Sequence, residues 1–282
     1  MSRGDSIRKL IEKTGSPRTR ESLATDLRSM GLDAGDTVIV HSSLSSLGWV
    51  NGGAVAVVQA LCDAVTADGT IVMPAHSYNY TDPAGWQDSP VPDAWVVTLR
   101  ETLPAFEPGL APTTRMGQIV EVFRSLPGAI RSRHPVTSFA AWGRHARSVT
   151  EGHTYENGQG EGSPLARVYE LDGKILLLGV GYDRNTSFHL AEYRVAETVR
   201  LRKLLPVPEE GRVVWREVDE SSFMRDAWLS ELGEAFEAAG HARVGQVGSA
   251  ETRLLSQREA VDFAVGWLRQ RYRETGSGSD QG

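Results

Sequence analysis

The chain has 282 residues, of which 40% are hydrophobic and 23% are charged, as in an ordinary globular protein. This composition excludes a disordered chain, a collagen and a coiled coil. Thirty basic and 36 acidic residues give a formal net charge of −6, which argues against a nucleic-acid partner because such a partner binds a basic surface. The single cysteine, Cys62, excludes a disulfide framework and a thiolate-rich zinc cluster.

We expect neither a signal peptide at the N-terminus nor a membrane span. Residues Met1–Leu10 lack the apolar run of a signal peptide, and no stretch approaches the ~18 apolar residues of a membrane span. The glycine- and serine-rich residues Gly276–Gly282 predict a flexible tail outside the fold. We therefore expect a cytoplasmic protein with no membrane partner, in which residues 1–275 form a single domain.

In the first part of the chain, hydrophobic periodicity predicts helices that alternate with short buried strands. The expected helices are Ser6–Thr14, Thr19–Gly31 and Ala54–Val65, and the expected strands are Thr37–Val40 and Thr70–Met73. A strand, a helix and a second strand in this order form a βαβ unit with parallel pairing. The following stretch, His76–Pro112, holds six of the 13 prolines and predicts irregular structure of the kind found in lids and binding loops.

The same alternation continues to the C-terminus, without an internal repeat or a linker. The expected helices are Gln118–Ser125, Gly143–Val149, Ser163–Leu171, Thr186–Thr198, Phe223–Ala239 and Gln257–Tyr272. The expected strands are Ser138–Ala141, Lys174–Val180, Arg212–Val218, Arg243–Val247 and Ala250–Leu255. This order predicts one α/β domain with three layers, helix–sheet–helix, around a mixed, largely parallel central sheet.

The strongest local site is the segment His189-Leu-Ala-Glu192, which follows a buried strand and lies on a predicted helix. Ligand sites of α/β sheets form at the carboxyl ends of strands. His189 and Glu192 are three residues apart and therefore share one helix face. The positive partial charge of a first helical turn disfavours an imidazolium, which keeps His189 neutral and able to accept a proton. From spacing alone, a packing or capping histidine is an equal alternative.

Two other segments have a functional and a structural interpretation. His153 and Glu156 repeat the H-x-x-E spacing, and two such pairs can mark a di-metal site, but the surrounding glycines disfavour the long helix that this site needs. We therefore expect no metal. The loop His41–Gly53 presents four serines and three glycines between a strand and a helix. Its backbone N–H groups could bind an anion, or it could be an ordinary connection, since it matches no phosphate-binding motif.

Several stretches taken together resemble the aminoglycoside 3-N-acetyltransferase family. In chain order they are Val40–Leu44 with Gly52 and Gly53, Asp68–Pro74, Arg131–Pro135 with Ser138–Ala141, Gly160–Pro164, Gly173–Gly179 and His189–Glu192. Their order and spacing match the family from about Arg20 to Tyr272, which is nearly the whole chain.

The resemblance implies acetyl transfer from acetyl-CoA to the 3-amino group of the 2-deoxystreptamine ring of aminoglycosides, which gives antibiotic resistance and requires no metal. It implies that His189 is the catalytic base and that Glu217 orients it, with Glu192 as a local competitor for that role. Such a carboxylate fixes the imidazole tautomer and stabilises the imidazolium that forms. The resemblance also implies that Asp219 contacts the substrate.

The remaining contacts are expected from the loops around these residues. Further substrate contacts are expected from Tyr78, Asn79, Asp82 and Glu192. Contacts to acetyl-CoA and to the developing oxyanion are expected from His41, Ser42, Ser43, Leu44, Thr186 and Ser187. Three other functions stay open: acetylation of a different small amine, a catalytically silent CoA-binding homologue, and a metallohydrolase.

Overall fold

The structure is a computed structural model that describes residues 3–86, 90–221 and 226–275. The predicted tail at residues 276–282 lies outside the described residues, as does the start of the helix predicted from residue 223. Within the described ranges, no helix is both long and apolar enough to cross a membrane.

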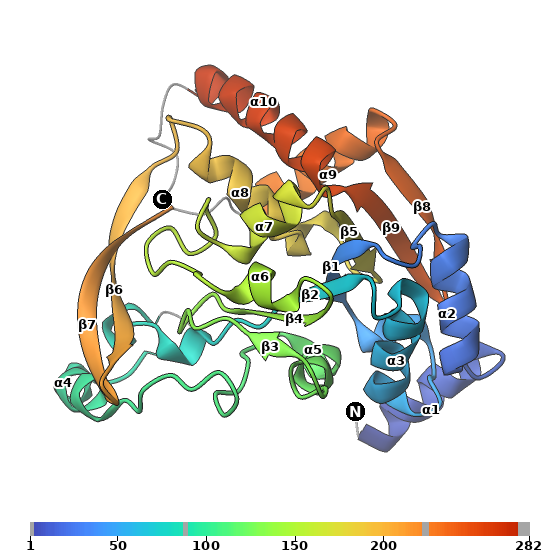
Figure 1. The fold of residues 1–282 in the computed structure, drawn as a ribbon, viewed down its shortest axis with the longest axis horizontal. Helices are drawn as coiled ribbons and strands as arrows, with labels where there is room; N and C mark the ends of the chain where they lie inside the picture. Colours follow the sequence, from blue (N-terminus) through green and yellow to red (C-terminus); the bar gives the residue numbers. More distant parts are fainter. Residues whose placement is uncertain (1–2, 87–89, 222–225, 276–282) are drawn as a thin grey trace.

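The order of helices and strands follows the prediction over most of the chain (Figure 1). The helices are α1 (Arg3–Thr14), α2 (Arg20–Ser29), α3 (Gly53–Val65), α4 (Asp93–Thr102), α5 (Gly117–Arg124), α6 (Ala146–Thr150), α7 (Pro164–Glu170), α8 (Ser187–Tyr193), α9 (Asp226–Ala238) and α10 (Gln257–Thr275). The strands are β1 (Thr37–Ser42), β2 (Thr70–Pro74), β3 (Ile130–Arg131), β4 (Phe139–Gly143), β5 (Lys174–Leu178), β6 (Arg200–Glu209), β7 (Arg212–Ser221), β8 (Ala242–Val247) and β9 (Ala250–Ser256).

Seven strands form one mixed sheet in the order β3-β4-β2-β1-β5-β9-β8. The three central strands are parallel, since β1 pairs in parallel with β2 on one side and with β5 on the other. The outer strands pair antiparallel. The carboxyl ends of β2, β1 and β5 therefore lie next to one another at one edge of the sheet, where α/β folds form ligand sites.

Helices cover both faces of this sheet, which confirms the predicted three-layer α/β fold (Figure 1). The alternation within β1 shows the division: Val38 and Val40 pack with α2, α3 and α5, whereas Ile39 packs with the layer of α6 to α10. All three side chains are fully buried. Burial of each contributes about 1.5–3 kcal/mol to folding, which explains why the central strands are apolar on both faces.

A long two-stranded ribbon, β6–β7, stands apart from the sheet (Figure 1), and the sequence analysis had found only its second strand. The ribbon turns at Glu210 and Gly211, whose φ angles of 49° and 78° fit a two-residue hairpin turn. Strand β6 was missed because Pro206 and Pro208 argue against a strand. In the described part of the chain, the outer edge of β6 pairs with no further strand, so a proline whose missing N–H would face that edge costs no hydrogen bond.

The prediction of irregular structure throughout His76–Pro112 is wrong for residues 93–102, which form α4. No residue of α4 is buried, and the prolines on both sides of it favoured irregular structure for the whole stretch. Pro92 precedes the helix, a position that proline tolerates. The indole N–H of Trp215 donates to the backbone oxygen of Arg100 at 3.0 Å, which attaches α4 to the ribbon.

Candidate active site

A cavity of about 1110 Å³ opens at the carboxyl ends of the central strands. Three histidines line it: His41 near the end of β1, His76 just beyond β2 and His189 on α8, the helix that follows β5. We call this space the histidine cavity. The parallel pairing of β2, β1 and β5 brings these side chains together although they are far apart in the sequence.

His189 is paired with Glu192 in the first turns of α8. The imidazole Nδ1 lies 2.8 Å from the carboxylate Oε2, and the side chains are only 12% and 1% exposed. A carboxylate can only accept, so we assign the proton to Nδ1, and whenever the ring is neutral Nε2 carries the lone pair. The i,i+3 spacing on one helix produces this contact, in agreement with the helix face expected from the sequence.

The structure does not bring Glu217 to His189. Glu217 lies on β7 with its side chain 67% exposed, 3.6 Å from Arg202. Asp219 is on the same outer face, 66% exposed and 3.9 Å from the same arginine. Alternation along the strand is the physical reason, because it turns Val218 and Glu220 inward and Glu217 and Asp219 outward.

The carboxylate that β7 does bury is Glu220, which the sequence analysis overlooked. Its side chain accepts a hydrogen bond from the hydroxyl of Tyr193, the residue after Glu192. Burial raises the pKa of Glu220 above its ordinary value. This hydrogen bond joins the end of the ribbon to α8, the helix that carries His189. In the sequence, only the alternation of inward- and outward-facing residues along β7 could have indicated it.

His41 and His76 are neutral at pH 7. Burial, together with the smaller effect of the neighbouring His189, lowers the pKa of each imidazole to about 3. The Nε2 atom of His41 lies 3.3 Å from the hydroxyl of Thr186, at the start of α8. Neither ring is therefore a cation that would repel an ammonium substrate.

Most of the residues predicted to contact acetyl-CoA lie around the histidine cavity. Those that line it are His41, Ser42, Ser43, Leu44 and Thr186. Ser187 does not, because it is fully buried and its hydroxyl accepts from the Gln257 side-chain amide at 3.1 Å.

Of the predicted substrate contacts beyond β2, only Tyr78 lines the histidine cavity. The Asn79 side chain accepts from the Thr114 hydroxyl at 3.0 Å. Asp82 is held by two hydrogen bonds of 2.8 and 2.7 Å from the Arg100 guanidinium on α4. Asn79 and Asp82 thus have hydrogen-bond partners in neighbouring segments.

A buried arginine that the sequence did not single out holds the segment around His76. Arg131 donates to the backbone oxygen of Ala75 at 2.5 Å and to the hydroxyl of Ser77 at 2.8 Å, the residues on either side of His76. Burial lowers the pKa of Arg131 to about 10, so the guanidinium is still charged at pH 7. The position of His76 is therefore set by a charged group with strong hydrogen bonds.

The second H-x-x-E segment has a structural role in this arrangement. His153 Nδ1 lies 2.9 Å from the Ser132 hydroxyl, and its Nε2 lies 2.7 Å from the backbone oxygen of Gly158. Both ring nitrogens thus have partners within the protein. Among residues 3–86, 90–221 and 226–275, no group of three or more His, Cys, Asp or Glu side chains is placed to hold a metal ion.

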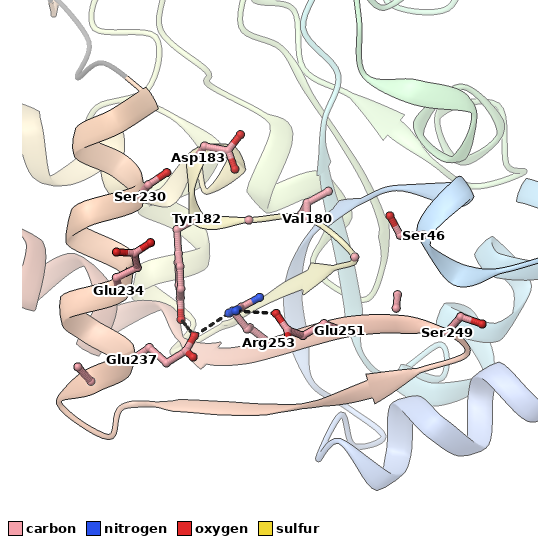
Figure 2. A pocket seen from close by; sticks show the side chains of 14 residues that line it. Ser46, Val180, Tyr182, Asp183, Ser230, Glu234, Glu237, Ser249, Glu251 and Arg253 are labelled. Atoms are coloured by element: carbon pink, nitrogen blue, oxygen red, sulfur yellow. Dashed lines mark hydrogen bonds and ion pairs between the residues drawn. The ribbon is translucent and has the colours of Figure 1, made fainter. Parts of the chain in front are cut away.

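A second cavity, of about 740 Å³, adjoins the first and shares Val180 and Asp183 with it. Figure 2 shows the acidic side chains on its wall, with Arg253 between two of them. The guanidinium lies 2.6 Å from Glu237 and 2.7 Å from Glu251, and the Tyr182 hydroxyl donates to Glu237 at 2.9 Å. These contacts form a surface network, and the lining contains no histidine.

Comparison with known proteins places the chain in a family. The family model described as aminoglycoside 3-N-acetyltransferase matches residues 39–269. The chain therefore belongs to the aminoglycoside 3-N-acetyltransferase family, a family of acyltransferases, as the resemblance had implied.

The similarity to individual members extends over nearly the whole chain. The SPbeta prophage-derived aminoglycoside N(3')-acetyltransferase-like protein YokD of Bacillus subtilis strain 168 is 50% identical over 93% of this chain and 96% of its own. Aminoglycoside N(3)-acetyltransferase VII of Streptomyces paromomycinus is 36% identical over 95% and 98%. The solved structure of AAC-IIIb in a binary complex with CoASH is 32% identical, covers 91% and 98%, and superposes with a TM-score of 0.82.

Proposed function

We propose that this protein transfers the acetyl group of acetyl-CoA to the 3-amino group of the 2-deoxystreptamine ring of an aminoglycoside. The observation that carries the proposal is the His189–Glu192 pair at the wall of the histidine cavity. The CoASH complex of AAC-IIIb supports the donor, and the names of the relatives support the acceptor.

Acetyl-CoA can supply hydrogen-bond partners for polar atoms of the cavity that have none within the protein. Two polar atoms in its lining, Ser42 Oγ and His76 Nε2, are buried without a hydrogen-bond partner. A thioester and its pantetheine amides offer the acceptors and donors that such atoms need. His41, Ser42, Ser43, Leu44 and Thr186 are the proposed acetyl-CoA contacts.

The pair acts by general-base catalysis in a direct transfer. An ammonium is not a nucleophile, so the acceptor reacts as the neutral amine after it has lost one proton to solvent. As the nitrogen bonds to the thioester carbon, His189 Nε2 removes a second proton from it. The carbon–sulfur bond then breaks, and the leaving thiolate takes that proton from the imidazolium. Glu192 keeps the receiving tautomer in place and stabilises the imidazolium, so we assign the orienting role to Glu192 rather than Glu217.

Thiol release from acetyl-CoA, measured with a panel of aminoglycosides, tests this proposal. Replacing His189 with Gln should lower turnover about 10²–10⁴-fold. His241→Gln is the matched control, because this histidine is 44% exposed and lies beside Glu259 rather than in the cavity. Equal turnover of the two variants, both folded by melting curves, would remove His189 as the base.

A second candidate is acetylation of a different small amine. Aminoglycosides carry several positive charges and call for carboxylates in their pocket. Among the described residues that line the histidine cavity, Asp183 is the single carboxylate, and it is paired with Arg184 at 2.9 Å. Arg115 adds a positive charge to the same wall. Thiol release with monoamines but with none of the aminoglycosides would favour this candidate.

A further inference from the structure

His76 is a buried histidine with an unsatisfied nitrogen in the wall of the histidine cavity. Its side chain is 1% exposed, and its Nε2 has no hydrogen-bond partner. Leaving such an atom unsatisfied costs about 1–3 kcal/mol. A nitrogen of this kind, at the surface of a ligand-sized cavity, points to a ligand atom that completes its hydrogen bonding.

The other ring nitrogen indicates which kind of partner is missing. His76 Nδ1 lies 3.0 Å from the Tyr78 hydroxyl. An imidazole lone pair accepts more strongly than a phenol oxygen, so we assign Tyr78 as the donor and Nδ1 as the acceptor. The ring proton is then on Nε2, and the missing partner is a hydrogen-bond acceptor.

The charge state of His76 agrees with a donor rather than a base. Burial lowers the pKa of its imidazole to about 3, and His189, His41, His153 and Arg131 act in the same direction. A nitrogen of such low basicity does not compete with His189 for the proton of an amine. A neutral N–H still donates a strong hydrogen bond to a developing oxyanion, as neutral imidazoles do at other active sites.

The ring is also held rigidly, which a donor of this kind needs. Arg131 holds the residues on both sides of it, Ala75 through its backbone oxygen and Ser77 through its hydroxyl. The ring packs edge-on against Phe139 and Tyr78, with centroid separations of 5.4 and 5.6 Å. Its dipole is therefore oriented before the reaction begins, which is the condition under which oxyanion donors are effective.

We propose that His76 donates its Nε2–H to the thioester oxygen of acetyl-CoA and stabilises the negative charge that gathers there during transfer. The inference rests on the proposed function. As the amine nitrogen bonds to the carbonyl carbon, the π electrons of the C=O bond move to the oxygen that His76 holds. When the carbon–sulfur bond breaks, the C=O bond returns, and the proton taken by His189 passes to the thiolate sulfur. His76 neither gains nor loses a proton.

The hydrogen bond from His76 to the thioester oxygen can be measured by isotope-edited infrared spectroscopy of [1-¹³C]acetyl-CoA bound to the protein in the absence of an amine substrate. A hydrogen bond weakens the C=O bond, so the carbonyl band of the wild-type complex should lie at or below its position in water. In His76→Ala it should move to higher wavenumber, and in His76→Gln, which keeps an N–H donor, it should return part of the way. His153→Gln is the control, because this nearby histidine bonds Ser132 and Gly158.

Kinetics give the matching readout. Loss of one oxyanion donor lowers kcat about 10²–10³-fold, so His76→Ala should do so while its Kd for CoA stays within about threefold. His76→Gln should recover at least about tenfold of that loss. Turnover of a folded His76→Ala within about threefold of wild type would overturn the proposal.

The wild-type spectrum alone keeps the proposal falsifiable if His76→Ala does not fold. A carbonyl band at the wavenumber of a thioester in aprotic solvent would show that no donor reaches the oxygen, and the proposal would fail. If the wild-type protein acetylates aminoglycosides but the carbonyl band has the same wavenumber in His76→Ala as in wild type, only this inference fails. If acetyl-CoA does not bind at all, the proposed function fails with it.

Discussion

Replacing Glu192 with Gln keeps the shape of the side chain and removes its charge from behind His189. The carboxylate is 1% exposed and lies 2.8 Å from the imidazole Nδ1, so solvent does not compensate for the change. A hydrogen bond to a charged group contributes about 1.5–3 kcal/mol. The imidazolium forms only when His189 takes the proton, so the lost stabilisation raises the activation free energy rather than weakening substrate binding. We therefore expect kcat to fall about 10–150-fold.

The assay is thiol release from acetyl-CoA at saturating acceptor, with kcat and KM determined separately and a melting curve for each variant. Glu217→Gln is the matched control: this carboxylate is 67% exposed, and exposed pairs such as Glu217–Arg202 contribute little. We expect it to keep kcat within about twofold. A deeper kcat loss in Glu217→Gln than in Glu192→Gln, with both folded, would refute the reasoning and return the orienting role to Glu217.

Three further outcomes are expected. Burial holds the pKa of His41 and of His76 at about 3 and that of His134 well below its ordinary value. The unfolded chain therefore binds more protons below pH ~6.5, and the unfolding free energy should fall by up to about 1.4 kcal/mol per histidine for each pH unit down toward pH 3. Melting temperatures that stay flat from pH 7 to pH 5 would contradict this. Arg131→Met removes the guanidinium that donates to the backbone oxygen of Ala111 and one of the two side-chain donors to that of Ala75, the other being the Ser138 hydroxyl. Urea unfolding should therefore show a loss of about 1–3 kcal/mol, and a loss well under about 1 kcal/mol would argue against the role of Arg131 in holding the segment around His76. CoA at about 100 times its Kd should add about 2.7 kcal/mol of stability, seen as a higher melting temperature, and an unchanged melting temperature would count against the donor.

The central strands were predictable because their signal is local. Runs such as Val38–Val40 and Ile175–Leu178 are apolar at every position, as in strands that are buried on both faces. The structure indeed covers both faces of β1 and β5 with helices. The same holds for the His189–Glu192 pair, whose i,i+3 spacing is contained in one helical turn.

Features that depend on tertiary contacts were beyond the sequence. Which carboxylate of β7 faces inward depends on the pairing of β7 with β6, and β6 was hidden by its prolines. The resemblance therefore pointed to Glu217, whereas the strand buries Glu220 instead. His76 went unnoticed for a related reason: it follows Met73-Pro74 in a stretch predicted to be irregular, and only the parallel pairing of β1 with β2 brings it to the cavity of His189.

NMR of the product decides whether acetylation of the 3-amino group depends on His189. An aminoglycoside incubated with acetyl-CoA and the wild-type protein should carry one new acetyl group, with an amide correlation to the nitrogen on carbon 3 of the deoxystreptamine ring. His189→Gln, still binding CoA, should form this product about 10²–10⁴-fold more slowly. An acetyl group on any other nitrogen, or an undiminished rate in the folded variant, would contradict the assignment.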